Sequence, residues 1–128
     1  MNGFTKGELE VMQVLWEHGL LKPADIQEHF PRPIRNAALR SVLLVLLEKE
    51  HVVRVRKGRA YCYKAKTPRQ RTLKKMTQQL AQIFTGGSSA ALIVQLIKSE
   101  QLSDDDIREL KRITNEKTGK NPPSKRKE

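Results

Sequence analysis

The sequence predicts a mainly α-helical protein with one small β hairpin, and three observations support this fold class. Apolar residues in the segment 34–49 recur at the i, i+3, i+4, i+7 spacing of a single helical face. Two short segments, 52–56 and 60–65, instead alternate and are rich in β-branched or aromatic residues, as strands are. Gly58 lies between these segments and supplies the positive φ angle that a tight hairpin turn needs.

The first helix has recognisable start and stop signals. Thr5 and Glu8 have the spacing of a capping box, in which each side chain accepts a hydrogen bond from the other residue's amide. Gly19 is expected to end the helix. Trp16 lies on the apolar stripe, so we expect it in the core and not as a stacking platform. The apolar link 20–21 can add a one- or two-residue strand beside the hairpin.

Prolines mark the boundaries of the short second helix. Pro23 suits its first turn, and Pro31 and Pro33 stop it before the third helix begins near Ile34. Two short helices, a turn and a longer helix have the spacing of a helix-turn-helix module. Together with the hairpin, they predict a winged helix-turn-helix domain over residues 1–66.

The third helix changes character along its length. Its segment 43–47 is apolar almost all round, which exceeds what one buried face requires. Leu44 and Val45 are therefore either packed against neighbours or exposed, and the segment is expected mainly to pack. The segment 35–41, with its short polar and basic side chains, is the better candidate for contacts with DNA bases.

The chain is strongly basic, with 25 Lys and Arg against 14 Asp and Glu and a formal net charge of +11. Between Arg54 and Lys75 there are ten basic residues and no acidic one. Such a density favours a polyanion as partner, and nucleic acid is the commonest polyanion. The alternative is that the basic run is merely a solvated face.

Particular side chains suit contacts with duplex DNA. An arginine such as Arg40 can donate two hydrogen bonds to guanine, and Asn36 can pair with adenine. Cations on the hairpin suit phosphates, which set affinity and register rather than sequence. The candidate DNA-binding residues are Arg35, Asn36, Arg40 and Ser41 on the third helix and Arg54, Arg56, Lys57 and Arg59 on the hairpin. The alternative for Arg40 is an ion pair with Glu48 or with a carboxylate of the second helix.

Three amphipathic helices are expected in residues 67–118. Ser103 caps the last of them, and the charges of Asp104, Asp105 and Asp106 suit its first turn better than a metal site. Their apolar faces have no core of their own, so we expect this region to dimerise with a second copy of the chain. The candidate dimerisation residues are Leu73, Met76, Leu80, Ile83, Phe84, Leu92, Ile93, Leu96, Ile107 and Leu110. The polar, basic tail 119–128 is expected to be disordered.

No pattern of a catalytic, cofactor or metal site is found, so we expect that the protein is not an enzyme. The histidines His18, His29 and His51 have no metal-ligand spacing, and no phosphate-binding loop or nucleophile motif is present. The single cysteine, Cys62, excludes an internal disulfide and is expected to be a buried filler and not a reactive thiol. Without a signal-peptide core or an apolar run near the roughly 20 residues that span a bilayer, we expect a cytoplasmic protein.

Several segments together resemble the penicillinase-repressor (BlaI/MecI/CopY-like) family of bacterial transcriptional regulators. The matching pieces are FTKGELEVMQVLW, LRSVLLVLLEKE running into HVVRV, the hairpin string KGRAYCYKA, FTGGS and LSDDDIRELKRI, which cover about residues 4–115. The resemblance implies a homodimer of winged-helix domains that binds a palindromic operator and represses the adjacent genes. It also implies dimerisation through the C-terminal helices.

The resemblance further implies a route of release from DNA. In antibiotic-resistance members, a membrane sensor metalloprotease leads to repressor cleavage at an Asn-Phe bond in the segment that matches 92–97, so such a protease is a candidate partner. The matching pair here is Gln95-Leu96, a departure that weighs against cleavage at this bond. Copper-responsive members have paired Cys-x-Cys motifs near the C-terminus, and this chain has none.

Three more departures from the family pattern fall in or just after the third helix. The family usually has Thr where Ala38 stands and often Arg where Val45 stands, which implies a changed operator or fewer contacts per half-site. Glu50 replaces the glycine normally found at the following corner, so we expect a strained backbone there or a corner of different construction.

These observations favour a dimeric, sequence-specific, DNA-binding transcriptional repressor. Two alternatives remain open. The first is a winged-helix module used mainly for protein contacts, which the apolar segment 43–47 favours. The second is an RNA-binding protein, against which the low aromatic content of 5% argues.

Overall fold

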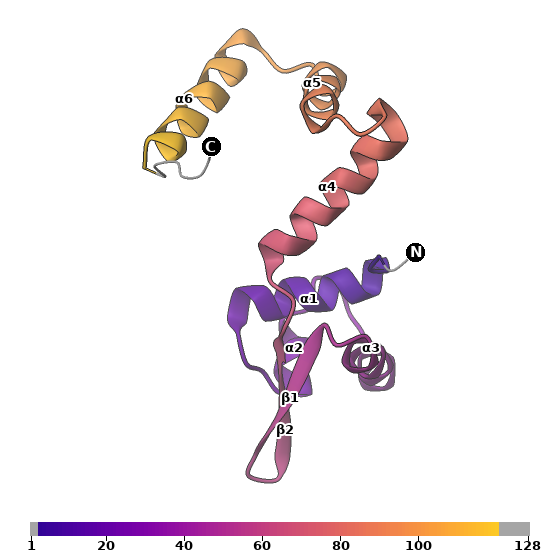
Figure 1. The fold of residues 1–128 in the computed structure, drawn as a ribbon. Coiled ribbons are helices and arrows are strands. Elements are labelled where there is room, and N and C mark those ends of the chain that lie inside the picture. Colours follow the sequence, from indigo (N-terminus) through magenta and orange to yellow (C-terminus); the bar gives the residue numbers. More distant parts are fainter. Residues whose placement is uncertain (1–2, 121–128) are drawn as a thin grey trace. The chain divides into compact units, whose positions relative to one another are not determined.

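The structure is a computed structural model that describes residues 3–120, with side chains up to residue 116. Over this range it has six α-helices and one antiparallel hairpin, which confirms the predicted fold class (Figure 1). The elements are α1 (Lys6–His18), α2 (Pro23–His29), α3 (Asn36–Glu48), β1 (Val52–Lys57), β2 (Ala60–Ala65), α4 (Arg69–Thr85), α5 (Ser89–Ser99) and α6 (Asp104–Lys120). The expected disordered tail begins within α6, and its residues 121–128 lie outside the described range.

The chain divides into two compact units, one that ends at Thr77 and one that begins at Gln78. The core of the first unit is formed by α1, α2, α3 and the base of the hairpin. Trp16 packs against this core, as the sequence predicts, and its indole nitrogen donates a hydrogen bond to the Thr67 carbonyl at 2.8 Å. The buried core residues are Val11, Met12, Val14, Leu15, Ile26, Phe30, Leu39, Leu43, Leu46, Val52 and Tyr63.

The ends of α1 form as the sequence predicts. The Thr5 hydroxyl accepts a hydrogen bond from the Glu8 amide at 3.1 Å, and a Glu8 carboxylate oxygen accepts one from the Thr5 amide at 3.1 Å. Gly19 ends the helix with a φ of 82° and donates its amide hydrogen to the Leu15 carbonyl. Both ends of the helix thus satisfy backbone groups that have no partner within the helix.

The hairpin is antiparallel, and its two strands join at a turn in which Gly58 has a φ of 63°. Leu21 exchanges two backbone hydrogen bonds with Tyr63, at 2.9 and 2.7 Å, so the short strand expected at 20–21 forms a single bridge beside β2. Cys62 is buried, in agreement with the expected filler role. In Figure 1 the hairpin extends away from α1, α2 and α3, with its turn at the far end.

Glu50 forms the corner after α3 with a φ of 63°, a conformation that is uncommon for a residue with a side chain. The Glu50 amide donates to the Leu47 carbonyl at 3.0 Å, and the His51 amide donates to the Leu46 carbonyl at 2.9 Å. This pair of bonds is the helix-ending pattern in which glycine usually holds the left-handed position. The strained backbone expected at Glu50 is therefore present.

Two ion pairs fix α1 against the helix-turn-helix. Lys49, at the end of α3, contacts both oxygens of the buried Glu8 carboxylate at 3.1 and 3.2 Å. Arg32, in the turn between α2 and α3, contacts the Glu10 carboxylate at 2.8 Å. The hydrogen bond from Arg32 lowers the pKa of Glu10 and raises that of Arg32 itself. Arg32 precedes α3 and Lys49 follows it, so the two ion pairs connect α1 to the chain on both sides of α3.

His51 occupies the junction between α3 and the hairpin. Its Nδ1 lies 2.8 Å from the Thr67 hydroxyl, and its ring centroid lies 4.4 Å from that of Phe4. Burial lowers the pKa of His51 below its ordinary value, and the charge of Lys49 lowers it further. The neutral imidazole is therefore the form that suits the folded protein.

In the second unit the helix starts are capped and the apolar faces are open. Ser103 and Asp106 exchange side-chain-to-amide hydrogen bonds at the start of α6, at 3.1 and 3.2 Å. From Gln78 onward the exposed large apolar side chains are Leu80, Ile83, Phe84, Ile93, Val94, Leu96, Leu110 and Ile113. In the described range no single helix is long and apolar enough to cross a bilayer; α4 and α5 have sufficient length and apolar character only together, and they are bent by 79° at their junction.

Candidate nucleic-acid interface

The outer face of α3 presents polar side chains from its first two turns. Because α3 buries a stripe of leucines in the core, its opposite face is turned to solvent. Asn36 and Arg40 are exposed and, being four residues apart, lie together on this face. Ser41 is exposed too, and its hydroxyl donates to the Ala37 carbonyl at 3.1 Å. Arg35 is the exposed residue that precedes the helix, and its backbone is extended.

Arg40 is held by its neighbour on the same face. Its Nε donates a hydrogen bond to the side-chain oxygen of Asn36 at 2.7 Å. Its two terminal nitrogens remain available to donate to another partner. Within the described residues Arg40 forms no ion pair with Glu48 or with a carboxylate of α2, the alternative raised by the sequence.

The apolar half of α3 packs with one exception. Leu43 and Leu46 are buried, and Val45 and Leu47 are partly covered. Leu44 is 56% exposed, so of the two alternatives that the sequence left for this residue, exposure is the one found, while the segment as a whole mainly packs. Leu44 follows Arg40 by four residues and therefore continues the outer face. One exposed leucine is ordinary for a protein surface, so this segment offers little apolar area for a partner protein.

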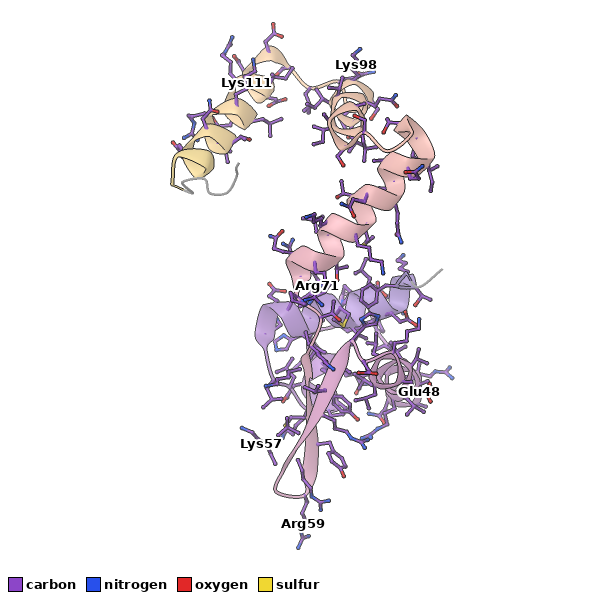
Figure 2. All side chains as sticks on the ribbon, in the orientation of Figure 1. Glu48, Lys57, Arg59, Arg71, Lys98 and Lys111 are labelled. Carbon is purple, nitrogen blue, oxygen red and sulfur yellow. The ribbon has the colours of Figure 1, made fainter. Side chains whose placement is uncertain are left out.

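The hairpin carries cations on one face and at its turn. The Arg54 and Arg56 guanidinium carbons lie 4.3 and 5.6 Å from the centroid of the Tyr61 ring. Figure 2 shows Lys57 and Arg59 at the turn, with side chains directed away from α1, α2 and α3. None of these four cations forms an ion pair with a carboxylate in the described range. All four charges therefore remain available to an anionic partner.

A cleft of about 590 Å³ separates the start of α3 from the hairpin. It brings together four of the predicted DNA-binding residues, which come from two different elements. Its lining residues are Lys22, Pro23, Ala24, Asn36, Arg40, Arg54, Arg59, Ala60, Tyr61 and Tyr63. The other predicted residues, Arg35, Ser41, Arg56 and Lys57, do not line this cleft.

Sequence reasoning missed three polar side chains of the cleft. Lys22 directly precedes the proline that opens α2, and its closeness to the third helix follows from helix packing that the sequence alone does not show. Tyr61 and Tyr63 alternate along β2, so they share one hairpin face, and the strand register places Arg54 and Arg56 on that face as well. The alternation was visible in the sequence, but the register was not.

The chemistry of this cleft is that of an anion-binding surface. Its ionisable groups are cations and tyrosines, and cations repel a metal ion. Among the described residues, no three His, Cys, Asp or Glu side chains gather as metal ligands. A concave surface with several unpaired guanidinium groups suits phosphate, because each guanidinium can form two parallel hydrogen bonds to phosphate oxygens.

The candidate dimerisation residues lie on α4, α5 and α6, and most are exposed. Ile83 and Phe84 are the most open, at 70% and 63%. Leu92 differs, because its own chain already buries it to 5% exposure. The pair Gln95-Leu96 lies inside α5, and both side chains are exposed.

A family model named for the penicillinase repressor matches residues 4–116. The penicillinase repressor of Bacillus licheniformis is 22% identical over 114 residues, which cover 88% of this chain and 89% of that protein.

Two of the solved structures that are similar to the chain come from bacteria. The YusO protein of Bacillus subtilis is 19% identical with a TM-score of 0.53, over 90% of this chain and 74% of its own. BpsR of Bordetella bronchiseptica, whose DNA binding is regulated by 6-hydroxynicotinic acid, is 18% identical with a TM-score of 0.52, over 80% of this chain and 79% of its own. At these identities the likeness shows the fold alone. Because the family model spans most of the sequence, the chain belongs to the penicillinase repressor family.

Proposed function

We propose that the protein is a homodimeric transcriptional repressor that binds a palindromic DNA operator. The first turns of α3 enter the major groove, and the hairpin lies along the flanking sugar–phosphate backbone. Membership of the penicillinase repressor family supports the assignment as a DNA-binding repressor. The observation that carries the proposal is the cleft between α3 and the hairpin, where three unpaired arginines from two elements face the same space.

The helix α3 and the hairpin have different tasks in this proposal. Arg40, oriented by Asn36, donates its terminal nitrogens to a guanine edge. Arg54, Arg56, Lys57 and Arg59 contact phosphates, which contributes affinity without sequence preference. If a dimer neutralises about six phosphates, its affinity for DNA should fall by roughly three decades when the salt concentration rises from about 50 to 200 mM.

The C-terminal helices supply the dimer contact. Most large apolar side chains of α5 and of the second half of α4 are exposed in the single chain, and an open apolar surface of this kind is typical of an interaction site. A two-fold dimer would bury the same patch on both copies. On a palindromic operator, each copy would place its α3 in one of two half-sites that lie about one helical turn of DNA apart, or a multiple of this.

Release of the operator by a membrane sensor metalloprotease is part of the same proposal, with the repressor working in the bacterial cytoplasm. The bond that matches the family's cleavage position, Gln95-Leu96, lies within α5. A helix must unwind locally before a protease can bind it in an extended form. Because Gln95-Leu96 differs from the family's Asn-Phe pair, we expect cleavage at a neighbouring bond, or release of the operator by a signal other than proteolysis.

The test is an enrichment of DNA sites from a random duplex library with the full chain, followed by binding titrations with the enriched site. We expect an inverted repeat to be enriched and its binding to weaken steeply with salt. Duplex RNA should compete poorly. Absence of any enriched sequence would refute the repressor assignment, and preferential competition by RNA would favour the RNA-binding alternative.

A further inference from the structure

Tyr61 lies at the centre of the cationic hairpin face. The strand register pairs it directly with Arg56, and Arg54 is its diagonal neighbour on the same face. The guanidinium carbon of Arg54 is 4.3 Å from the ring centroid, and that of Arg56 is 5.6 Å away. The Arg56 Nε also donates to the Gly58 carbonyl at 3.1 Å. Tyr61 itself is 41% exposed and lines the cleft beside Arg40.

We infer that Tyr61 is a positioning residue for DNA binding, which holds Arg54 and Arg56 in place for phosphate contacts. This inference rests on the proposed function. The negative face of an aromatic ring attracts a guanidinium group, most effectively within about 6 Å of the centroid. One ring therefore stabilises two like charges that would otherwise repel each other and move freely in solvent.

Pre-ordering of long side chains strengthens binding because less conformational freedom is lost when the complex forms. Arginine on a strand has many rotamers, and neither Arg54 nor Arg56 has a carboxylate partner in the described range to restrict them. The ring and the Gly58 carbonyl are the contacts that restrict these two side chains. A mainly structural role for Tyr61 is less suited to the geometry, since the side chain is exposed and lies outside the buried core.

The experiment compares Tyr61→Phe, which keeps the ring, with Tyr61→Leu, which keeps an apolar side chain but removes the ring. The probe is a fluorescein-labelled duplex of random sequence, because phosphate contacts do not depend on sequence. Both variants are made in the wild-type chain and in a chain that carries Arg54→Gln and Arg56→Gln. Thermal melting of all proteins confirms that the hairpin substitutions leave the first unit folded.

With the arginines present, Tyr61→Leu should bind the duplex about three- to tenfold more weakly than Tyr61→Phe. With both arginines replaced, the two variants should bind alike. Equal binding in the arginine-containing chain would overturn the inference. A difference that persists without the arginines would also overturn it, because the ring would then contact DNA directly. If the wild-type chain fails to bind any duplex at low salt, the proposed function itself fails.

Discussion

Replacement of Arg40 by alanine tests the division of the interface into a base-contacting helix and a backbone-contacting hairpin. Arg40 is held by one hydrogen bond, from its Nε to Asn36 at 2.7 Å, which leaves both terminal nitrogens free. A bidentate contact from these nitrogens to guanine is worth about 1–3 kcal/mol of discrimination against the wrong base. Arg40→Ala should therefore lose roughly 5- to 150-fold of preference at one base pair of each half-site.

Asn36 affects the same base preference indirectly, through its hydrogen bond to Arg40. Without it, Arg40 keeps its charge and its donors but loses the contact that orients them. Fixing a long side chain on binding costs about 0.5–1.5 kcal/mol, so Asn36→Ala should reduce the same preference by about two- to twelvefold. The double variant should behave like Arg40→Ala alone, because the two residues act as one unit.

The assay is fluorescence anisotropy with the enriched site, single-base variants of it and a random duplex. Lys57→Ala is the matched control, since Lys57 lies at the hairpin turn and should contact only phosphate. It should weaken binding to all duplexes by a similar factor. Equal losses on specific and random DNA for Arg40→Ala would refute the placement of α3 in the major groove. Additive losses in the double variant would refute the orienting role of Asn36.

Four further predictions follow from particular residues. Glu50→Gly should raise stability by about 0.5 kcal/mol in thermal melts, since relief of left-handed strain exceeds the greater freedom of glycine in the unfolded chain, whereas Glu50→Ala should not. Because the folded state lowers the pKa of His51, stability should fall as pH falls below its ordinary value of 6.5, and His51→Gln should flatten that fall; an unchanged melting profile would contradict this. Leu80→Asp and Ile93→Asp should each give monomers by light scattering that bind DNA poorly, and intact dimers in both would place the dimer contact elsewhere. If Leu44 contacts a thymine methyl, uracil at that position should weaken binding of the wild type but not of Leu44→Ala.

Sequence periodicity was sufficient for the fold because each element has its own local signal. The capping box of Thr5 and Glu8 and the turn at Gly58 depend on neighbours close in sequence, and both formed as expected. The strain at Glu50 was also visible from the sequence, through a glycine missing from the family pattern. Such features are predictable because few alternative backbone conformations satisfy them.

The details of the interface were less predictable, since they depend on contacts between elements. Leu44 lies in a segment that is apolar all round, where periodicity does not indicate which face is buried. The contact of Tyr61 with Arg54 depends on strand register, and a slip of one residue would move the arginine to the opposite face. Lys22 reaches the cleft only because α2 packs beside α3.

The salt dependence of duplex binding tests most directly whether the cleft between α3 and the hairpin is the DNA-binding surface. For the wild-type dimer, the logarithm of affinity should fall against the logarithm of salt concentration with a slope of about −5. The double variant Arg54→Gln, Arg59→Gln removes two cations of the cleft from each subunit. Its slope should be shallower by about 3 to 4. An unchanged slope in a folded, dimeric variant would show that DNA binds to another surface of the protein.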